Sequence, residues 1–133
     1  MRIVLLNDNR LLTTALNARV DQDPRFEIVG SASDGPEAAR LVDKVRPDVV
    51  LINACVPGND ALVATRLIMH GAATPRVLIM ADADAELDAV EAHDAGASAF
   101  LRKPRSAADL LETLELAAVL AQVHLSQAES DEP

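Results

Sequence analysis

The stretch Asp48-Val49-Val50-Leu51-Ile52-Asn53 decides the fold of this chain. An unbroken aliphatic run between two polar residues is typical of a strand that is buried on both faces. Pro47 precedes the run and Pro57-Gly58 follows it, so the strand is short and has sharp ends. A strand covered on both sides indicates a parallel sheet with helices packed on each face.

Similar short apolar runs alternate with helical patterns along the whole chain. This alternation predicts an α/β fold, a doubly wound five-stranded parallel sheet with five helices. Ligand sites in such sheets lie beyond the carboxyl ends of the strands, so the residues after each strand are the candidates for function. The expected strands are residues 2–6, 26–32, 48–53, 76–81 and 98–102, and the expected helices are residues 10–20, 35–45, 60–70, 85–95 and 106–125.

Composition excludes several classes of function. The chain has 133 residues with 12 basic and 21 acidic side chains, a net charge of −9, so this piece should repel nucleic acid and anionic membranes. A single cysteine allows neither an internal disulfide nor a multi-cysteine metal site. No apolar run is long enough to span a membrane, and no signal peptide is evident, so we expect a cytoplasmic single domain.

Four segments together carry a family resemblance: LLNDNRLL (5–12), PDVVLINACVPGNDAL (47–62), RVLIMADAD (76–84) and GASAFLRKP (96–104). They are similar to the receiver domain of two-component response regulators, closest to receivers that precede a helix-turn-helix output domain of the NarL/FixJ type. The resemblance implies a flavodoxin-like strand order of 2-1-3-4-5. It also implies a receiver-like domain over residues 1–125 and an acidic tail or linker over 126–133, with the output domain absent from this chain.

The resemblance fails where the family does its chemistry. Asn53 stands at the phosphoacceptor position, Asn7 replaces one metal-binding carboxylate, and Ala81 replaces the hydroxyl that follows strand four. Phe100 and Lys103 do match the family. We therefore expect a degenerate pseudo-receiver with no catalytic residue and weak or absent Mg²⁺ binding, since Mg²⁺ needs carboxylate oxygen. The degenerate pocket comprises Asn7, Asp8, Asn53, Cys55, Ala81, Phe100 and Lys103.

Several alternatives stay open for this pocket. Asn53 could be an engineered block to phosphorylation or could deamidate, but three coordinated departures favour natural loss. Asp8, the only retained acid, is expected to pair with Lys103, with Asn53 bridging them; otherwise Lys103 points into water or attracts a small anionic ligand. Cys55 is expected to be a small hydrophobic residue rather than a redox sensor. No dinucleotide, phosphate-loop or triad motif indicates an enzyme.

Without a phosphate switch, function should reside in surfaces. Acids Asp84, Asp88 and Glu91 are expected along one stripe of the fourth helix, near Arg102 and Arg105, and this charge pattern favours a two-fold dimer through helix four, strand five and helix five. The last helix has a second apolar face that indicates a dimer or interdomain contact. That face consists of Leu116, Val119, Leu120 and Val123.

The sequence thus predicts an atypical receiver that controls transcription through a missing output domain, by phosphorylation-independent dimerisation or by binding a small ligand. DNA would be contacted only by that missing domain. The alternative is a stand-alone interaction module that uses the acidic face of helix four.

Overall fold

The computed structural model describes residues 1–7, 14, 17–18, 20–54, 58–81 and 88–102. All of them belong to one compact unit, Met1–Lys103, and the second unit, Pro104–Pro133, lies outside the described residues. The expected first helix lies mostly outside them, and the last helix and the tail lie entirely outside. Among the described helices, none has the length and apolar character needed to cross a membrane.

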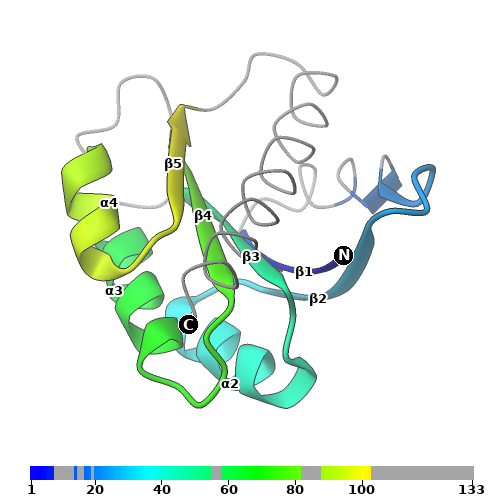
Figure 1. Cartoon of the computed structure of the whole chain (residues 1–133), viewed down its shortest axis with the longest axis horizontal. Helices are drawn as coiled ribbons and strands as arrows, with labels where there is room; N and C mark the ends of the chain where they lie inside the picture. The colour runs from blue at the N-terminus through cyan, green and yellow to red at the C-terminus, as the bar shows by residue number, and fades with distance from the viewer. Residues whose placement is uncertain (8–13, 15–16, 19, 55–57, 82–87, 103–133) are drawn as a thin grey trace, which may run out of the picture. The chain divides into compact units, whose positions relative to one another are not determined.

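Five parallel strands form one sheet, in the order β2-β1-β3-β4-β5 (Figure 1). The predicted strand order is therefore confirmed. The strands are β1 (Arg2–Leu6), β2 (Glu27–Ala32), β3 (Val49–Ala54), β4 (Arg76–Ala81) and β5 (Ala99–Arg102). Each lies within one residue of its predicted bounds. Because the chain crosses from β2 over β1 to β3, the direction of winding changes between β1 and β3, where doubly wound sheets bind their ligands.

Three helices are described: α2 (Gly35–Val45), α3 (Gly58–Met69) and α4 (Ala89–Ala95). The predicted α2 is confirmed, and α3 begins two residues earlier than expected. The prediction for α4 is wrong at its start, because Asp88 is the N-cap and not a helical residue. Its carboxylate accepts a hydrogen bond of 2.8 Å from the backbone N–H of Glu91, which satisfies one of the unpaired amides of the first turn.

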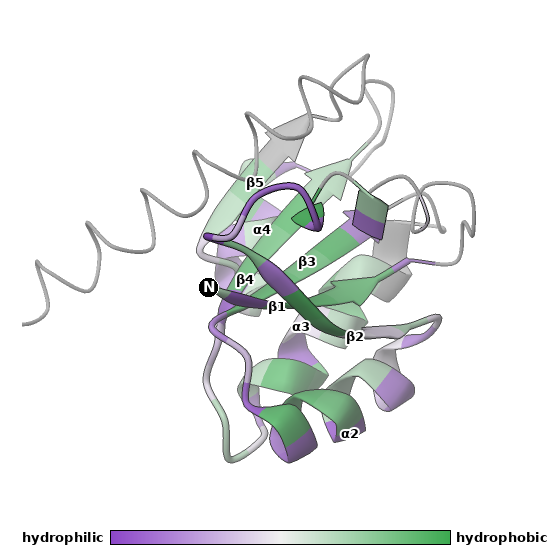
Figure 2. Ribbon diagram, turned by 90° about the vertical axis from the view of Figure 1, so that its right-hand side faces the viewer, coloured by the Kyte–Doolittle hydropathy of each residue, from purple (hydrophilic) through white to green (hydrophobic). Residues whose placement is uncertain are grey.

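The strands β1, β3 and β4 are buried on both faces, as the apolar runs predicted, whereas the edge strand β2 is mostly half-buried or exposed. Val50 and Ile52 of β3 belong to a core shared with α2, α3 and α4, and both are fully buried. Leu51 alternates with them and is 1% exposed on the opposite face. Figure 2 shows α2 and α3 below the sheet, with apolar residues among the polar ones on each helix. The ends of β1 and β3 are thus held by packing on both sides.

A glycine at the end of α4 is required by its backbone and by its neighbour. Gly96 has a φ of 112°, and a Cβ at this position would lie 2.9 Å from Cγ of Met69 on α3. We expect Gly96→Ala to lower the free energy of unfolding by about 1–3 kcal/mol, because the left-handed backbone and the clash both disfavour a side chain. Urea unfolding measures the change. Ser98→Ala, an exposed site in the same loop, should be nearly neutral, and equal effects of the two changes would contradict this explanation.

Candidate functional site

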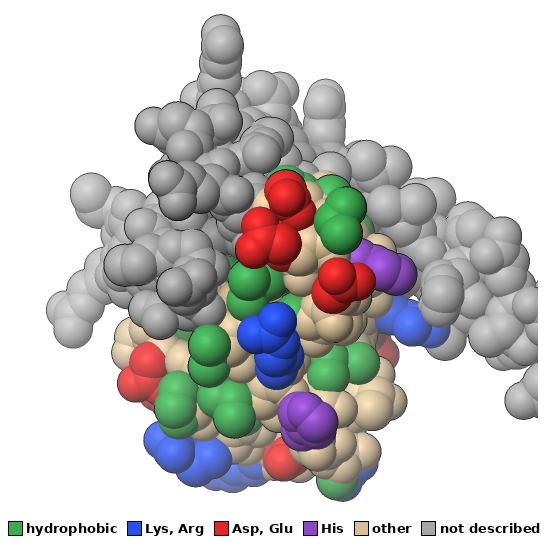
Figure 3. Space-filling view, turned by 90° about the vertical axis from the view of Figure 1, so that its left-hand side faces the viewer, with side chains coloured by type: hydrophobic (Ala, Val, Ile, Leu, Met, Phe, Trp, Pro, Cys, Tyr) green, Lys and Arg blue, Asp and Glu red, His purple; other side chains and the backbone are tan. Residues whose placement is uncertain are grey.

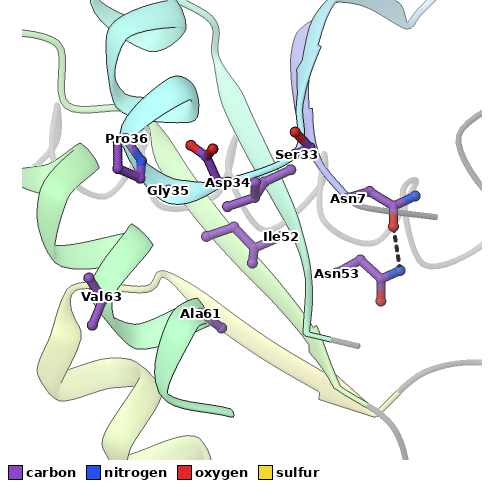
Figure 4. A pocket seen from close by; sticks show the side chains of 10 residues that line it. Asn7, Ser33, Asp34, Gly35, Pro36, Ile52, Asn53, Ala61 and Val63 are labelled. Carbon is purple, nitrogen blue, oxygen red and sulfur yellow. Dashed lines mark hydrogen bonds between the residues drawn. The ribbon is translucent and has the colours of Figure 1, made fainter. Parts of the chain in front are cut away.

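The carboxyl ends of β1 and β3 bring two asparagines together. In the ladder between these strands Leu6 is paired with Ile52, so the next residues, Asn7 and Asn53, also lie side by side. Nδ2 of Asn53 donates a hydrogen bond of 2.9 Å to Oδ1 of Asn7. Asn7 is 9% exposed and Asn53 is 4% exposed. This hydrogen bond, which we call the amide pair, lies where the sheet changes its direction of winding (Figure 4).

The backbones of Asn7 and Asn53 are also held in place by neighbouring strands. The N–H of Asn7 donates to the carbonyl oxygen of Ala32, at 2.9 Å, which continues the β1–β2 ladder by one residue. Asn53 is a regular residue of β3 and is paired with Met80 of β4. The backbone of each asparagine is therefore hydrogen-bonded or paired with a neighbouring strand. Forming the 2.9 Å hydrogen bond between the side chains then requires little further loss of backbone freedom.

Chemically, the amide pair is neutral. An asparagine side chain offers a carbonyl oxygen and an NH₂ group but no negative charge, and its nitrogen is not nucleophilic. Mg²⁺ prefers carboxylate oxygens and keeps its water shell unless charge compensates the loss. The described residues contain no cluster of three or more His, Cys, Asp or Glu side chains that could hold a metal ion.

Ala81 and Phe100 lie on neighbouring strands, close to the same end of the sheet. Ala81 ends β4 beside Ala54 and is fully buried. Its methyl group belongs to the core cluster against which Phe100 packs from β5, where Phe100 is partly buried. No side-chain hydroxyl is available at position 81, so β4 presents only a methyl group there.

The structure brings together part of the predicted pocket. Asn7, Asn53, Ala81 and Phe100 lie at or near the strand ends, whereas Asp8, Cys55 and Lys103 lie outside the described residues. The expected Asp8–Lys103 ion pair therefore stays a prediction. The structure gives Asn53 a hydrogen bond to Asn7, which the sequence analysis did not suggest. The signal was present, because each residue directly follows the same apolar strand pattern.

A hollow of about 200 Å³ adjoins the amide pair on the side of α2 and α3. The sequence analysis missed this feature, although the Asp34-Gly35-Pro36 turn after β2 marked a loop at the same edge of the sheet. Figure 4 shows the hollow between the start of α2 and the start of α3, with the amide pair at one end. Its lining residues are Leu6, Asn7, Ser33, Asp34, Gly35, Pro36, Ile52, Asn53, Ala61 and Val63.

The predicted acidic surface is described in part. Asp88 and Glu91 are both exposed, as is Asp94, and Val90 between them is 68% exposed. On the face shown in Figure 3, acidic side chains gather over α4 beside an apolar one. Arg102 ends β5. Asp84, Arg105 and the four aliphatic residues of the last helix lie outside the described residues, so the proposed dimer face is only partly described.

Comparison with known proteins gives one consistent family. The model of the response regulator receiver domain matches residues 3–115. The transcriptional regulatory protein LiaR of Bacillus subtilis is 28% identical over 117 residues, which cover 88% of this chain and 56% of LiaR. The transcriptional regulatory protein PdtaR of Mycobacterium tuberculosis is 35% identical over 116 residues, which cover 87% of this chain and 56% of PdtaR. The chain thus spans about half the length of these relatives.

Solved structures agree with the sequence comparison. A two-component response regulator of the LuxR family from Aurantimonas superposes with a TM-score of 0.75 at 30% identity, covering 91% of this chain and 85% of that one. Relatives also include a protein-glutamate methylesterase/protein-glutamine glutaminase of Pyrococcus horikoshii, in which the match covers 29% of the protein.

The amide pair itself can be tested by a double-mutant cycle. We expect Asn7→Ala and Asn53→Ala each to lower the free energy of unfolding by about 1–3 kcal/mol, because each leaves a buried amide without this partner. The double variant should cost less than the sum, with a coupling of about 0.5–3 kcal/mol. Urea unfolding of the four proteins measures the coupling. Strictly additive losses would show that the hydrogen bond contributes no stability.

Proposed function

Because the chain belongs to the response regulator receiver domain family, we propose that it is an atypical receiver that regulates transcription without phosphorylation at position 53. The amide pair carries this proposal. In this family an Asp at the end of strand three accepts the phosphoryl group, and in this chain that position is Asn53. Its neutral side chain is occupied by a hydrogen bond to Asn7, which itself replaces a carboxylate.

Charge explains why metal-dependent chemistry should be lost together with the nucleophile. Phosphoryl transfer relies on positioning and on cations that neutralise the charge that develops in the transition state. Two amides in place of two carboxylates remove negative charge that would hold Mg²⁺. Of the acids expected at this site, the sequence retains Asp8. We therefore propose that Mg²⁺ binds weakly or not at all.

Position 81, which takes part in the family's phosphorylation switch, has also lost the group that would bind a phosphoryl oxygen. A receiver normally uses a hydroxyl after strand four to bind the new phosphoryl oxygen, and here Ala81 provides a buried methyl group. Phe100, the expected aromatic partner, packs against the core cluster that includes Ala81. Three independent positions thus fit a protein that does not read phosphorylation.

The output is proposed from the relatives. LiaR and PdtaR are transcriptional regulatory proteins, and this chain matches about half of each. We propose that a DNA-binding domain accompanies the receiver in the full protein, since an acidic domain of net charge −9 is unsuited to bind DNA directly. A stand-alone interaction module is the competing reading, and the gene sequence after Pro133 decides between them.

We further propose that the signal passes through a homodimer of the α4–β5–α5 type. The exposed carboxylates of Asp88 and Glu91 lie at the start of α4, and Arg102 ends the adjacent strand β5. A two-fold axis can place acids of one protomer opposite the arginine of the other and repeat the contact twice. Exposed charge pairs of this kind are weakened by salt.

Phosphorylation is tested by intact-mass measurement after incubation with acetyl phosphate and Mg²⁺. The native chain should gain no phosphoryl group, whereas Asn7→Asp/Asn53→Asp should gain one, because it restores the nucleophile and a second carboxylate. The double variant should also bind Mg²⁺ about tenfold or more tightly in calorimetry. Asn53→Ala is the matched control and should behave as the native chain. A phosphoryl adduct on the native protein would refute the proposal.

Dimerisation is tested by light scattering with a charge swap. We expect Glu91→Arg to shift the protein toward the monomer through like-charge repulsion with Arg102, and Glu91→Arg/Arg102→Glu to restore the dimer. High salt should weaken the native dimer. Glu27→Arg, an exposed acid on β2 at the other edge of the sheet, is the control. A native mass that none of these changes alters would exclude this interface.

A further inference from the structure

The hollow beside the amide pair has a position and a wall that suit a ligand. It lies at the carboxyl ends of β1 and β3, where the winding direction changes and where open α/β sheets bind ligands. Leu6 and Ile52 come from the two strands, while Ala61 and Val63 come from α3. The hollow thus lies on the α2–α3 side of the strand ends, and, apart from Asn7 and Asn53, its described lining residues are not the positions at which the family carries out phosphorylation.

Its size suits a single ring. A cavity of about 150 Å³ lined by aliphatic side chains binds benzene, so the roughly 200 Å³ present here accommodates one ring with a small substituent. Apolar walls are supplied by Leu6, Pro36, Ile52, Ala61 and Val63. The buried amide pair forms a polar end, as Figure 4 shows.

The charge of its described lining disfavours anions. Among the residues that the structure describes, the lining includes the carboxylate of Asp34 and no Lys or Arg side chain. The start of α2, which could otherwise attract an anion, is already occupied by that carboxylate. Oδ1 of Asp34 accepts from the N–H of Glu37 at 2.8 Å, and the carbonyl oxygen of Asp34 accepts from the N–H of Ala38 at 3.0 Å. Pro36 has no N–H to offer.

A second carboxylate lies at the same edge. Oγ of Ser33 donates to Oε2 of Glu37 at 3.2 Å, so the side chain of Glu37 reaches back over the loop that lines the hollow. Ser33, Asp34 and Glu37 are all exposed, which places negative charge at the mouth and the neutral amides at the inner end. An entering anion would meet only like charge among the described residues of this loop.

We propose that this hollow binds a small planar ring compound that bears an uncharged amide-type substituent and no negative charge. The ring would lie between α2 and α3 against Leu6 and Ile52, with its polar substituent toward the amide pair. An amide both donates and accepts, which matches the side chains of Asn7 and Asn53 in kind. The inference rests on the proposed function for its biological role, since such a ligand would replace phosphorylation as the input signal.

Three nearly isosteric probes separate the possibilities: benzamide, benzoate and benzamidine, which are neutral, anionic and cationic. Titrations of the isotope-labelled chain are followed by backbone amide shifts in NMR spectra. Benzamide should shift the amides of Gly35, Ala61 and Asn53 in a saturable way, and benzoate should not. Preferential binding of benzoate or of benzamidine would overturn the proposed class, as would saturable benzamide shifts confined to residues outside the hollow.

Two tryptophan variants on one helix provide the structural control. Val63 lines the hollow and is 49% exposed, whereas Leu67 lies one turn later on α3, is 40% exposed and does not line it. Val63→Trp should obstruct the hollow and weaken benzamide binding by about tenfold or more, and Leu67→Trp should leave the affinity unchanged. Both sites are exposed, so neither variant should unfold the chain. Equal affinities would overturn the assignment of the site.

This outcome is separable from that of the phosphorylation test. A native chain that binds no benzamide and gains no phosphoryl group refutes the ligand site and leaves the atypical receiver intact. A native chain that binds benzamide and also gains a phosphoryl group supports the site but refutes its role as a substitute for phosphorylation.

Discussion

Burial of β3 on both faces is the constraint from which the arrangement of this domain follows. Val50 and Ile52 pack toward the helices α2 to α4, and Leu51 packs toward the other side. A strand with no solvated face requires a partner strand on each edge and a layer on each side, which a doubly wound sheet provides. Its carboxyl end is therefore fixed in space, and with it the side chain of Asn53.

At that fixed end of β3, a neutral hydrogen bond and a cluster of ionised carboxylates differ in whether they need a compensating charge. Carboxylates held close together repel one another and remain tolerable when a cation or a proton compensates them. The amide pair needs no such compensation, because each amide satisfies part of the other's hydrogen-bonding capacity. A site that would depend on metal and phosphoryl charge can thus fold without either, which fits regulation by assembly or by a neutral ligand.

Sequence reasoning predicted the framework well and the site in part. The strands themselves followed from apolar runs such as residues 76–81, because continuous hydrophobicity reports burial directly, whereas their order in the sheet was predicted from the family resemblance. The start of α4 was mistaken, because Asp88 suits both a helical stripe and an N-cap, and only the hydrogen bond to the N–H of Glu91 distinguishes them. The pairing of Asn7 with Asn53 was missed, since it depends on strand register, and a one-residue shift would separate the two side chains.

Sequence patterns could not predict the hollow beside the amide pair, because it too depends on how separate segments are placed in space. Its walls come from four separate segments, and its volume depends on how closely α2 approaches α3. A Cβ built on Gly35 would lie 3.2 Å from Cα and Cβ of Ala64, so a larger residue at either position would push the two helices apart and change the space between them. Because α2 and α3 are this close, the hollow is bounded by α3, and α3 is in turn in contact with α4. A ligand that wedges against Val63 would therefore act on the layer of helices that carries the proposed signalling face.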